Sequence, residues 1–216
     1  VARELEVSAS SVVRFAQTLG YDGWPALQEE LRDQLHETRR LVALTPESAE
    51  YIEQFVSAQG RNLAVLAGQA EAIERAAAQL AGARTVWLAG DRASAQVAAY
   101  AANYLRMIRP GVRLLPGSAS AYADHLLDVE PGDALWLTSM SRYSRNSLAL
   151  ARDLRTRLPI VLLTNEETSP LLPFATTSVL FATQSVSSLP SDVAAYATAH
   201  VLVLALARRT KGVQER

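Results

Sequence analysis

Two loops of the chain combine serine and arginine in a pattern suited to holding an anion. One covers Gly90–Ser94 and the other Ser139–Arg145, and each follows a short apolar stretch and opens a predicted helix. Backbone N–H groups at a helix start attract anions, and arginine offers a planar fork to phosphate or carboxylate. The candidate ligand-binding residues are therefore Gly90, Arg92, Ser94, Ser139, Ser141, Arg142, Ser144, Arg145 and Thr164. The competing interpretation is that the serines cap helices and the arginines are solvated or form surface ion pairs.

The elements around these loops alternate between apolar strands and helices. Strands are predicted at Thr85–Ala89, Val112–Leu115, Ala134–Thr138, Ile160–Thr164 and Ser178–Phe181. Helices are predicted near Ser94–Ile108, Ala119–Leu127, Ser144–Arg157, Ser169–Phe174 and Ser191–Arg208, after two helices over Ser48–Ala81 that are broken near Gly68. This order predicts an α/β fold, a five-stranded parallel sheet flanked by helices. Ligands bind beyond the carboxyl ends of such strands, so we expect the two loops to converge.

The first forty residues are helical in pattern and predict a partial, all-α helix-turn-helix segment. Ser8 is a good N-cap for a helix over Ala9–Leu19, Gly20 ends it, and Ala26–Thr38 forms the next helix. One face of the first helix is apolar, with Val12, Val13, Phe15, Ala16 and Leu19. The other face carries the candidate DNA-binding residues Ser10, Ser11, Arg14, Gln17 and Thr18. A plain helical hairpin is the alternative, because residues 1–40 hold five arginines against seven acids.

The segment Leu44-Thr45-Pro46 interrupts the helical pattern and predicts a boundary between a domain over residues 1–43 and a second over 44–216.

The composition of the 216 residues excludes several kinds of chemistry. With no cysteine and three scattered histidines, neither a disulfide nor a metal site is expected. Lys211 is the single lysine, so no interior amine is available for a Schiff base, and we expect no cofactor. No apolar run is long enough to cross a membrane, which favours a cytoplasmic protein.

The N-terminal residues resemble the helix-turn-helix domain of the RpiR-type bacterial regulators. That domain has a helix ending in a valine-serine turn, a T/S-V-V-R-F helix and an L-G-[FY]-x-G-[FW] segment. The matching residues are Val7-Ser8, Ser11-Val12-Val13-Arg14-Phe15, Leu19-Gly20-Tyr21 and Gly23-Trp24. The family's domain begins several tens of residues earlier, so the resemblance implies that this chain holds its later part.

The later residues resemble the sugar isomerase (SIS) domain that RpiR-type regulators carry, a five-stranded parallel sandwich that binds phosphosugars. Its G-x-G-x-S signature is matched by Gly90 and Ser94, and its S-x-S-G-x-[ST] signature by Ser139, Ser141 and Ser144. The segments Leu163-Thr164-Asn165 and Ser169-Pro170-Leu171 resemble the family's T-x-x-x-x-S-P-L element. Arg92 and Arg142 stand where the family has glycine.

The two arginines matter because arginine lacks the freedom of glycine to adopt positive φ. The exchange indicates a ligand that is smaller or differently charged than a hexose phosphate, or guanidinium groups that replace backbone contacts. A third possibility is a site that has decayed in a domain that only dimerises.

Taken together, the resemblance implies a transcription regulator that is not an enzyme and whose partners are DNA and a small effector, a phosphosugar or related anion. A homodimer or homotetramer is expected, because operator symmetry mirrors protein symmetry. The apolar helix Ser191–Arg208 is predicted to lie in a core or a dimer interface. An SIS-type isomerase is the alternative, but it needs an acid/base pair, and His125 has only Asp124 and the distant Glu166 as carboxylate candidates. A degenerate SIS domain used only for oligomerisation is the other alternative.

Overall fold

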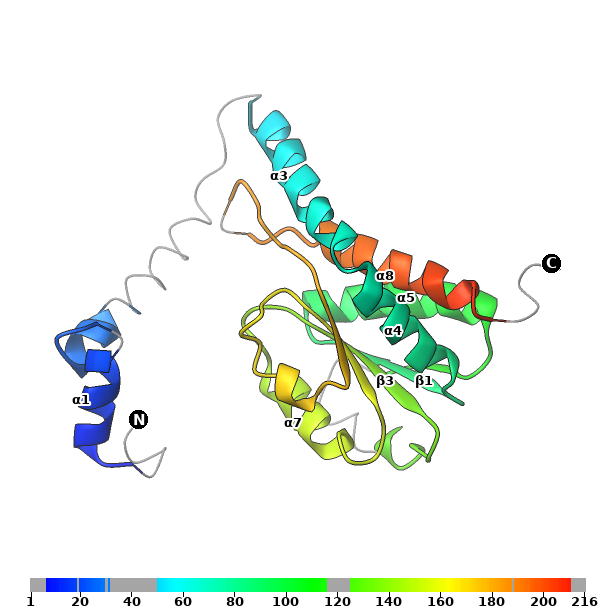
Figure 1. Cartoon of the computed structure of the whole chain (residues 1–216), viewed down its shortest axis with the longest axis horizontal. Helices are drawn as coiled ribbons and strands as arrows, with labels where there is room; N and C mark the ends of the chain where they lie inside the picture. The colour runs from blue at the N-terminus through cyan, green and yellow to red at the C-terminus, as the bar shows by residue number, and fades with distance from the viewer. Residues whose placement is uncertain are drawn as a thin grey trace. The chain divides into compact units, whose positions relative to one another are not determined.

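The computed structural model describes residues 7–18, 20–29, 31, 50–115, 125–187 and 189–210 (Figure 1). It divides into a small N-terminal unit and a larger α/β unit that starts at Ile52. The predicted boundary at residue 43, most of the predicted helix Ala26–Thr38 and the first residues of the predicted helix Ala119–Leu127 lie outside the described residues.

The small unit contains helix α1 (Ala9–Thr18) and a helical turn over residues 24–29. Ser8 caps α1 as predicted, because its Oγ accepts a hydrogen bond from the backbone of Ser11 at 3.2 Å. Gly20, with φ of 88°, ends the helix: its N–H donates to Gln17 O and the next N–H to Ala16 O.

Burial within α1 is confined to the centre of the predicted apolar face. Val12 and Ala16 are buried, whereas Val13 is 38% and Phe15 58% exposed. At about 100° per residue these four side chains span an arc of roughly 160°, so they share one side of the helix, with Val13 and Phe15 at its edges. Leu19, the fifth residue predicted for this face, lies outside the described residues.

The larger unit is built on a five-stranded sheet in which every pair is parallel, as predicted. Its strands are β1 (Val86–Ala89), β2 (Val112–Leu114), β3 (Ala134–Ser139), β4 (Ile160–Thr164) and β5 (Thr177–Leu180). The order across the sheet is β2-β1-β3-β4-β5, with Ala89 opposite Leu137 and Ser139 opposite Thr164. The central strands are buried on both faces, which explains their continuous apolar sequence.

Helices cover both faces of this sheet (Figure 1). Three of them pack on one face: α4 (Ala70–Ala81), α5 (Ala93–Ile108) and α8 (Val193–Ala207). On the other face lie α7 (Arg145–Leu154) and the short 3-10 helix η2 (Leu172–Phe174). The two apolar cores, one on each face, make the sheet the middle layer of a sandwich.

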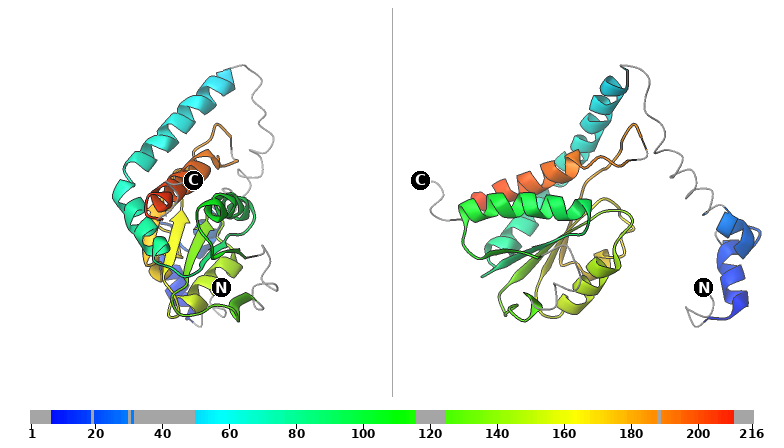
Figure 2. Two further views of the ribbon diagram at one scale, coloured as in Figure 1. Left: turned by 90° about the vertical axis from the view of Figure 1, so that its right-hand side faces the viewer. Right: turned by 180° about the vertical axis from the view of Figure 1, so that it is seen from behind.

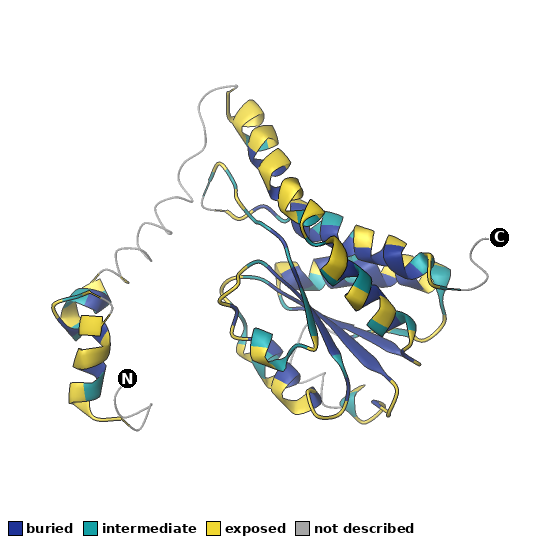
Figure 3. Ribbon diagram, in the orientation of Figure 1, coloured by how far each residue is buried: buried dark blue, intermediate teal, exposed yellow. Residues whose placement is uncertain are grey.

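Helix α3 (Glu50–Ala67) precedes α4 and separates from it near Gly68, as predicted. Most of α3 is exposed (Figure 3), but the polar residues Gln59 and Asn62 are buried. Asn62 holds the backbone of Gln184 from both sides: its Nδ2 donates to Gln184 O at 2.8 Å, and its Oδ1 accepts from Gln184 N at 3.2 Å. The amide of Gln59 also donates to Gln184 O, at 3.3 Å. These bonds attach α3 to the loop that follows β5.

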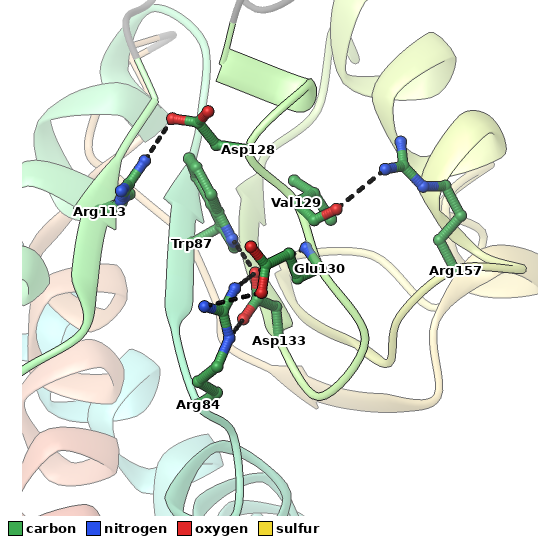
Figure 4. A network of polar contacts seen from close by, with 8 residues as sticks. All are labelled: Arg84, Trp87, Arg113, Asp128, Val129, Glu130, Asp133 and Arg157. Atoms are coloured by element: carbon green, nitrogen blue, oxygen red, sulfur yellow. Dashed lines mark hydrogen bonds and ion pairs between the residues drawn. The ribbon is translucent and has the colours of Figure 1, made fainter.

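A buried carboxylate ties β1 to the start of β3 (Figure 4). Asp133 is 1% exposed and accepts hydrogen bonds from Trp87 Nε1 at 2.9 Å and from Arg84 Nε at 3.0 Å. Burial alone would raise the pKa of Asp133, but these bonds, one from the Glu130 backbone and the Arg84 charge together lower it. This network lies at the amino ends of the strands, and its role is structural.

Candidate functional site

The two serine- and arginine-containing loops lie at the point where the sheet changes direction. The chain leaves β1 into α5 on one face of the sheet and leaves β3 into α7 on the other, while β1 and β3 are neighbours. In open parallel sheets such a switch point opens a crevice at the carboxyl ends of the strands, and ligands bind there. The loops Gly90–Arg92 and Met140–Ser144 border this position from the two sides.

Hydrogen bonds join the loops that follow four of the strands. Asn146 Nδ2, in the first turn of α7, donates to Asp91 Oδ2 of the loop after β1 at 3.3 Å. Asn165, directly after β4, accepts from the backbone N–H of Ser141 at 2.8 Å and donates to the Ser141 hydroxyl. The same amide donates to Thr183 Oγ1, after β5, at 3.2 Å. The predicted convergence of the loops is therefore present in the structure.

Both arginines at the glycine positions of the signatures adopt positive φ. Arg92 has φ 53° and ψ −123°, and Arg142 has φ 66°. Ser94 N donates to Asp91 O at 3.1 Å, so residues 91–94 form a type II′ turn with Arg92 at the position that favours glycine. Such backbone costs on the order of 1–3 kcal/mol and persists where the surroundings dictate it.

The structure leaves no room for a side chain at Gly90. A Cβ built there would lie 2.4 Å from Ser94 O, in the first turn of α5. This close packing of loop on helix fixes the start of α5 beneath the Arg92 turn.

The predicted ligand-binding residues divide into an exposed and a buried set. Arg92, Ser141, Arg142 and Arg145 are exposed, and Ser144 is half-buried. Ser94, Ser139 and Thr164 are buried, as is Gly90. The Ser144 hydroxyl accepts from Ser147 N at 3.0 Å and caps α7, which supports the structural interpretation of that serine.

The three exposed arginines are available to an anion. Within the part of the chain that the structure describes, no ion pair joins Arg92, Arg142 or Arg145 to a carboxylate. Two carboxylates lie close by: Asp91 accepts from Asn146 Nδ2 and from the backbone N–H of Arg92, and Glu166 Oε1 accepts from Ser141 Oγ at 3.4 Å. The edge of the site therefore offers guanidinium groups together with two acidic acceptors.

The candidate list omitted residues that the structure places in the site. Asn165 and Asn146 bridge the loops, and the Tyr143 hydroxyl lies 3.4 Å from Thr164 Oγ1. A usable signal exists for Asn165, a carboxamide directly after an apolar strand. For Asn146, which is half-buried at a helix start, the sequence gives no such signal.

Among the described residues no group of three His, Asp or Glu side chains could hold a metal ion. His125 is exposed, and within the same residues its imidazole forms no hydrogen bond or ion pair.

The candidate DNA-binding residues lie on the accessible side of α1. Ser10, Arg14, Gln17 and Thr18 are exposed, and Ser11 is half-buried. The hydroxyls of Ser10 and Ser11 each lie 2.8 Å from Ser8 Oγ, and Thr18 Oγ1 donates to Arg14 O at 2.9 Å. Arg14 and Gln17 are therefore the longest polar side chains on the exposed side of α1.

Comparison with known families matches both halves of the chain. The SIS domain family matches residues 79–207, and the helix-turn-helix domain of the rpiR family matches residues 1–38. The chain belongs to the SIS domain family. Together with the match to the rpiR-family helix-turn-helix, this gives the chain the domain composition of an RpiR-type transcription regulator, as the sequence predicts. A search of curated proteins found no significant match.

Solved structures give the same fold. The sugar isomerase domain of an RpiR transcription factor from Sphaerobacter thermophilus is 26% identical, with a TM-score of 0.69 over 75% of this chain and 94% of that one. The NanR protein of Vibrio vulnificus, complexed with ManNAc-6P, is 22% identical, with a TM-score of 0.72 over 99% of this chain and 80% of that one. A Methanococcus jannaschii protein with an inferred 3-hexulose-6-phosphate isomerase function is 16% identical, with a TM-score of 0.59 over 74% of this chain and 90% of that one. None of the helices in the described part has the length and hydropathy to cross a bilayer.

Proposed function

We propose that this RpiR-type regulator binds a phosphosugar or a related small anion at the carboxyl edge of its sheet, and that the ligand alters DNA binding. The observation that carries the proposal is the convergence of the loops after β1, β3, β4 and β5, with three arginines at their rim that form no ion pair within the described residues. Arginine pairs with phosphate through two parallel hydrogen bonds, which gives affinity and orientation together. The NanR structure with ManNAc-6P supports this class of effector.

The positive φ of Arg92 and Arg142 supports a site selected for its side chains. A glycine would form the same turns without strain, so the guanidinium groups supply something that backbone alone does not. We infer that they take over contacts to the anion that backbone N–H groups make in SIS domains with glycine at these positions. Ser141, Arg145 and the N-terminus of α7 complete the proposed site, and Ser144 contributes as the cap that orients α7.

A hydrogen-bonded path connects the proposed site with α3. It runs from Ser141 to Asn165, from Asn165 to Thr183, and from the neighbouring Gln184 to Asn62. Helix α3 follows the helix-turn-helix residues along the chain. A ligand that repositions Ser141 or Asn165 would shift the loop after β5 and with it α3, provided that it binds one arrangement more tightly than the other.

The DNA partner is assigned to α1, whose exposed face carries Arg14 and Gln17. Helix-turn-helix proteins read palindromic sites as symmetric pairs, so the active form is proposed to be a homodimer or a dimer of dimers. Because its target is the bacterial chromosome, its site of action is the cytoplasm.

Catalysis is not part of the proposal. An aldose–ketose isomerase must move a proton between neighbouring carbons with a positioned acid and base. Of the groups that could serve, Glu166 interacts with Ser141 and Asn165, and His125 is exposed and without a carboxylate partner in the described residues.

Thermal unfolding of the full chain with a panel of phosphosugars, each paired with its unphosphorylated sugar, tests the effector. A true effector at 100 times its Kd adds about 2.7 kcal/mol, or roughly 5–10 °C in Tm, whereas the unphosphorylated partner has little effect. No shift with any phosphorylated compound would favour a domain used only for oligomerisation. Production of a ketose from an aldose phosphate would favour the isomerase.

DNA binding is tested separately, by selecting duplexes from a random pool with the full chain. Recovered sites should be palindromic and bound with a steep salt dependence. Arg14→Ala should weaken binding, and unchanged affinity would remove Arg14 from the proposed contact surface.

A further inference from the structure

Helix α7 and the residues on either side of it carry a local concentration of positive charge. Residues 142–157 include five arginines and a single acid, Asp153, in a chain whose formal net charge is −1. All five arginines are exposed, and α7 packs on the face of the sheet opposite α5 and α8, as the right-hand view of Figure 2 shows. We call these residues the α7 arginine row: Arg142, Arg145, Arg152, Arg155 and Arg157.

The charge of the α7 arginine row is not neutralised within the described part of the chain. No ion pair there joins any of its members to a carboxylate. Arg155 lies over the ring of Phe174 at 5.5 Å, and Arg157 donates to the carbonyl oxygen of Val129 at 3.1 Å (Figure 4). Both partners are uncharged, so they order the two arginines and leave their positive charge available.

Five other arginines of the α/β unit do pair with carboxylates. Arg84 and Arg113 contact Asp133 and Asp128 at 3.0 and 2.6 Å (Figure 4). Carboxylates of α4 pair with three more: Arg75, Arg208 and Arg209. The whole chain has 21 basic and 22 acidic residues, so the lack of acidic partners belongs to the surface around α7 and not to the overall composition.

Two arginines of the row and one alanine lie along one line of α7. Arg145, Ala149 and Arg152 are exposed and follow each other at intervals of four and three, the spacing that keeps side chains on one side of a helix. Arg145 and Arg152 are therefore ~10 Å apart along the helix axis. Helix stability does not explain Arg145, because a cation in the first turn of a helix opposes the macrodipole.

We propose that the α7 arginine row contacts the phosphate backbone of duplex DNA, as a second DNA-contacting surface besides α1. This inference rests on the proposed DNA binding of the chain and assigns part of it to the α/β unit. Each strand of a duplex presents one phosphate about every 3.4 Å along the axis, so a row ~10 Å long can meet more than one phosphate. Arginine pairs with phosphate through two parallel hydrogen bonds. Such contacts hold and orient a protein on DNA without reading its sequence.

The surroundings of the row favour DNA over an acidic protein as the partner. Residues 128–185, which the structure describes throughout, expose no large apolar side chain, whereas protein–protein interfaces have an apolar centre. Residues 1–40 hold five arginines against seven acids, although attraction between cations and phosphate supplies much of the affinity for DNA. The α7 arginine row would add attraction that residues 1–40 do not provide.

The salt dependence of DNA binding tests the proposal. The full chain is titrated against a mixed-sequence duplex at several salt concentrations, where each phosphate contact contributes about −0.9 to the slope of log K against log salt. Arg152→Gln with Arg155→Gln, outside the proposed effector site, should make the slope less steep by about 1–2 and raise the Kd about 5- to 30-fold. Arg75→Gln with Arg208→Gln removes the same charge from α4 and the end of α8, and should leave slope and Kd close to those of the parent.

A charge-preserving pair separates a phosphate contact from a loss of local packing, because Arg155 also stacks on Phe174. Arg152→Lys with Arg155→Lys keeps both charges but not the planar groups, so the slope of the parent should be retained. If the lysine pair lost the salt dependence as the glutamine pair does, charge would not be the cause and the proposal would be wrong.

Proximity to DNA is tested with a photoactivatable azide attached to a single thiol. The chain has no cysteine, so Ala149→Cys on the line between Arg145 and Arg152, or Ala78→Cys on the exposed side of α4, provides a unique site. Irradiation with the duplex should give a covalent DNA adduct at position 149 and none at position 78. In a chain that binds DNA, an unchanged slope for the glutamine pair or no adduct at position 149 would overturn this inference alone. A parent chain that binds no duplex would overturn the proposed function as well.

Discussion

Replacing Arg92 by glycine is expected to stabilise the fold and weaken effector binding at the same time. The type II′ turn at Arg92 holds a non-glycine residue at φ 53° and ψ −123°, a strain of about 1–3 kcal/mol. Glycine removes that strain, but it lowers the stability by about 0.5–1 kcal/mol because it gives the unfolded chain more conformational entropy to lose on folding. The net gain is about 1 kcal/mol, or roughly 2–4 °C in Tm for a chain of this size.

Arg92→Ala is the matched comparison. Alanine also lacks the guanidinium but has a Cβ, so the strain stays and the stability should remain close to that of the parent. Both variants lose the charge-assisted hydrogen bonds of Arg92 to an anion, worth about 1.5–3 kcal/mol, which is a 10- to 100-fold rise in the effector Kd. Arg152→Ala, at an exposed position in the last turn of α7, controls for the loss of one positive charge.

Two measurements decide this prediction: thermal unfolding without ligand and calorimetric titration with an active phosphosugar. If Arg92→Gly were no more stable than Arg92→Ala, the backbone strain assigned to the turn would be wrong. If both variants bound the effector as tightly as the parent, Arg92 would have no part in the site.

Three further substitutions probe the packing, the buried carboxylate and the path to α3. Gly90→Ala should cost about 1–3 kcal/mol in chemical denaturation because its Cβ would lie 2.4 Å from a helix carbonyl, whereas Gly60→Ala in the open interior of α3 should gain about 0.5–1 kcal/mol. Asp133→Ala leaves the indole N–H of Trp87 buried without its acceptor, so we expect a loss of about 1–3 kcal/mol. Because folding lowers the pKa of Asp133, its contribution is present at neutral pH and is lost as the pH falls below about 4, so the gap between parent and variant in urea should shrink there. Asn62→Ala removes two hydrogen bonds to the backbone of Gln184 in the loop after β5. It should reduce the effect of the ligand on DNA affinity more than it changes ligand affinity, and an unaltered coupling would exclude this path.

Much of the α/β unit could be predicted from the sequence because its strands are buried on both faces. A strand such as Ile160–Thr164 has no polar residue before its end, and its bounds agree with the prediction. The last strand was placed one residue late, since Thr177 at its start is polar while Phe181 just beyond its end is apolar. The predicted strand ends differ from the observed ones where the polarity of a side chain does not follow the hydrogen bonding of its backbone.

The site was harder to predict because its geometry depends on contacts between distant residues. Sequence alone located the loops, but Asn165 bonds to Ser141 across 24 positions and Asn146 bonds to Asp91 across 55. Arginine at a glycine position indicated that the freedom to adopt positive φ was lost, whereas both Arg92 and Arg142 adopt positive φ in the structure. For α8, a pattern that is apolar all round could not tell which side packs on the sheet and which faces outward.

The strain at Arg92 and the packing at Gly90 have one common consequence for the effector. Gly90 is packed against the first turn of α5, and Asp91 is held by Asn146, so the type II′ turn over residues 91–94 has a fixed shape whatever residue occupies position 92. Glycine would fill that shape at lower energy, which leaves the guanidinium as the reason for an arginine there. A guanidinium adds most to binding when its partner is charged. The proposed site should therefore discriminate strongly between a sugar and its phosphate, because removing the anionic group would leave the rim arginines without the partner for which the turn is strained.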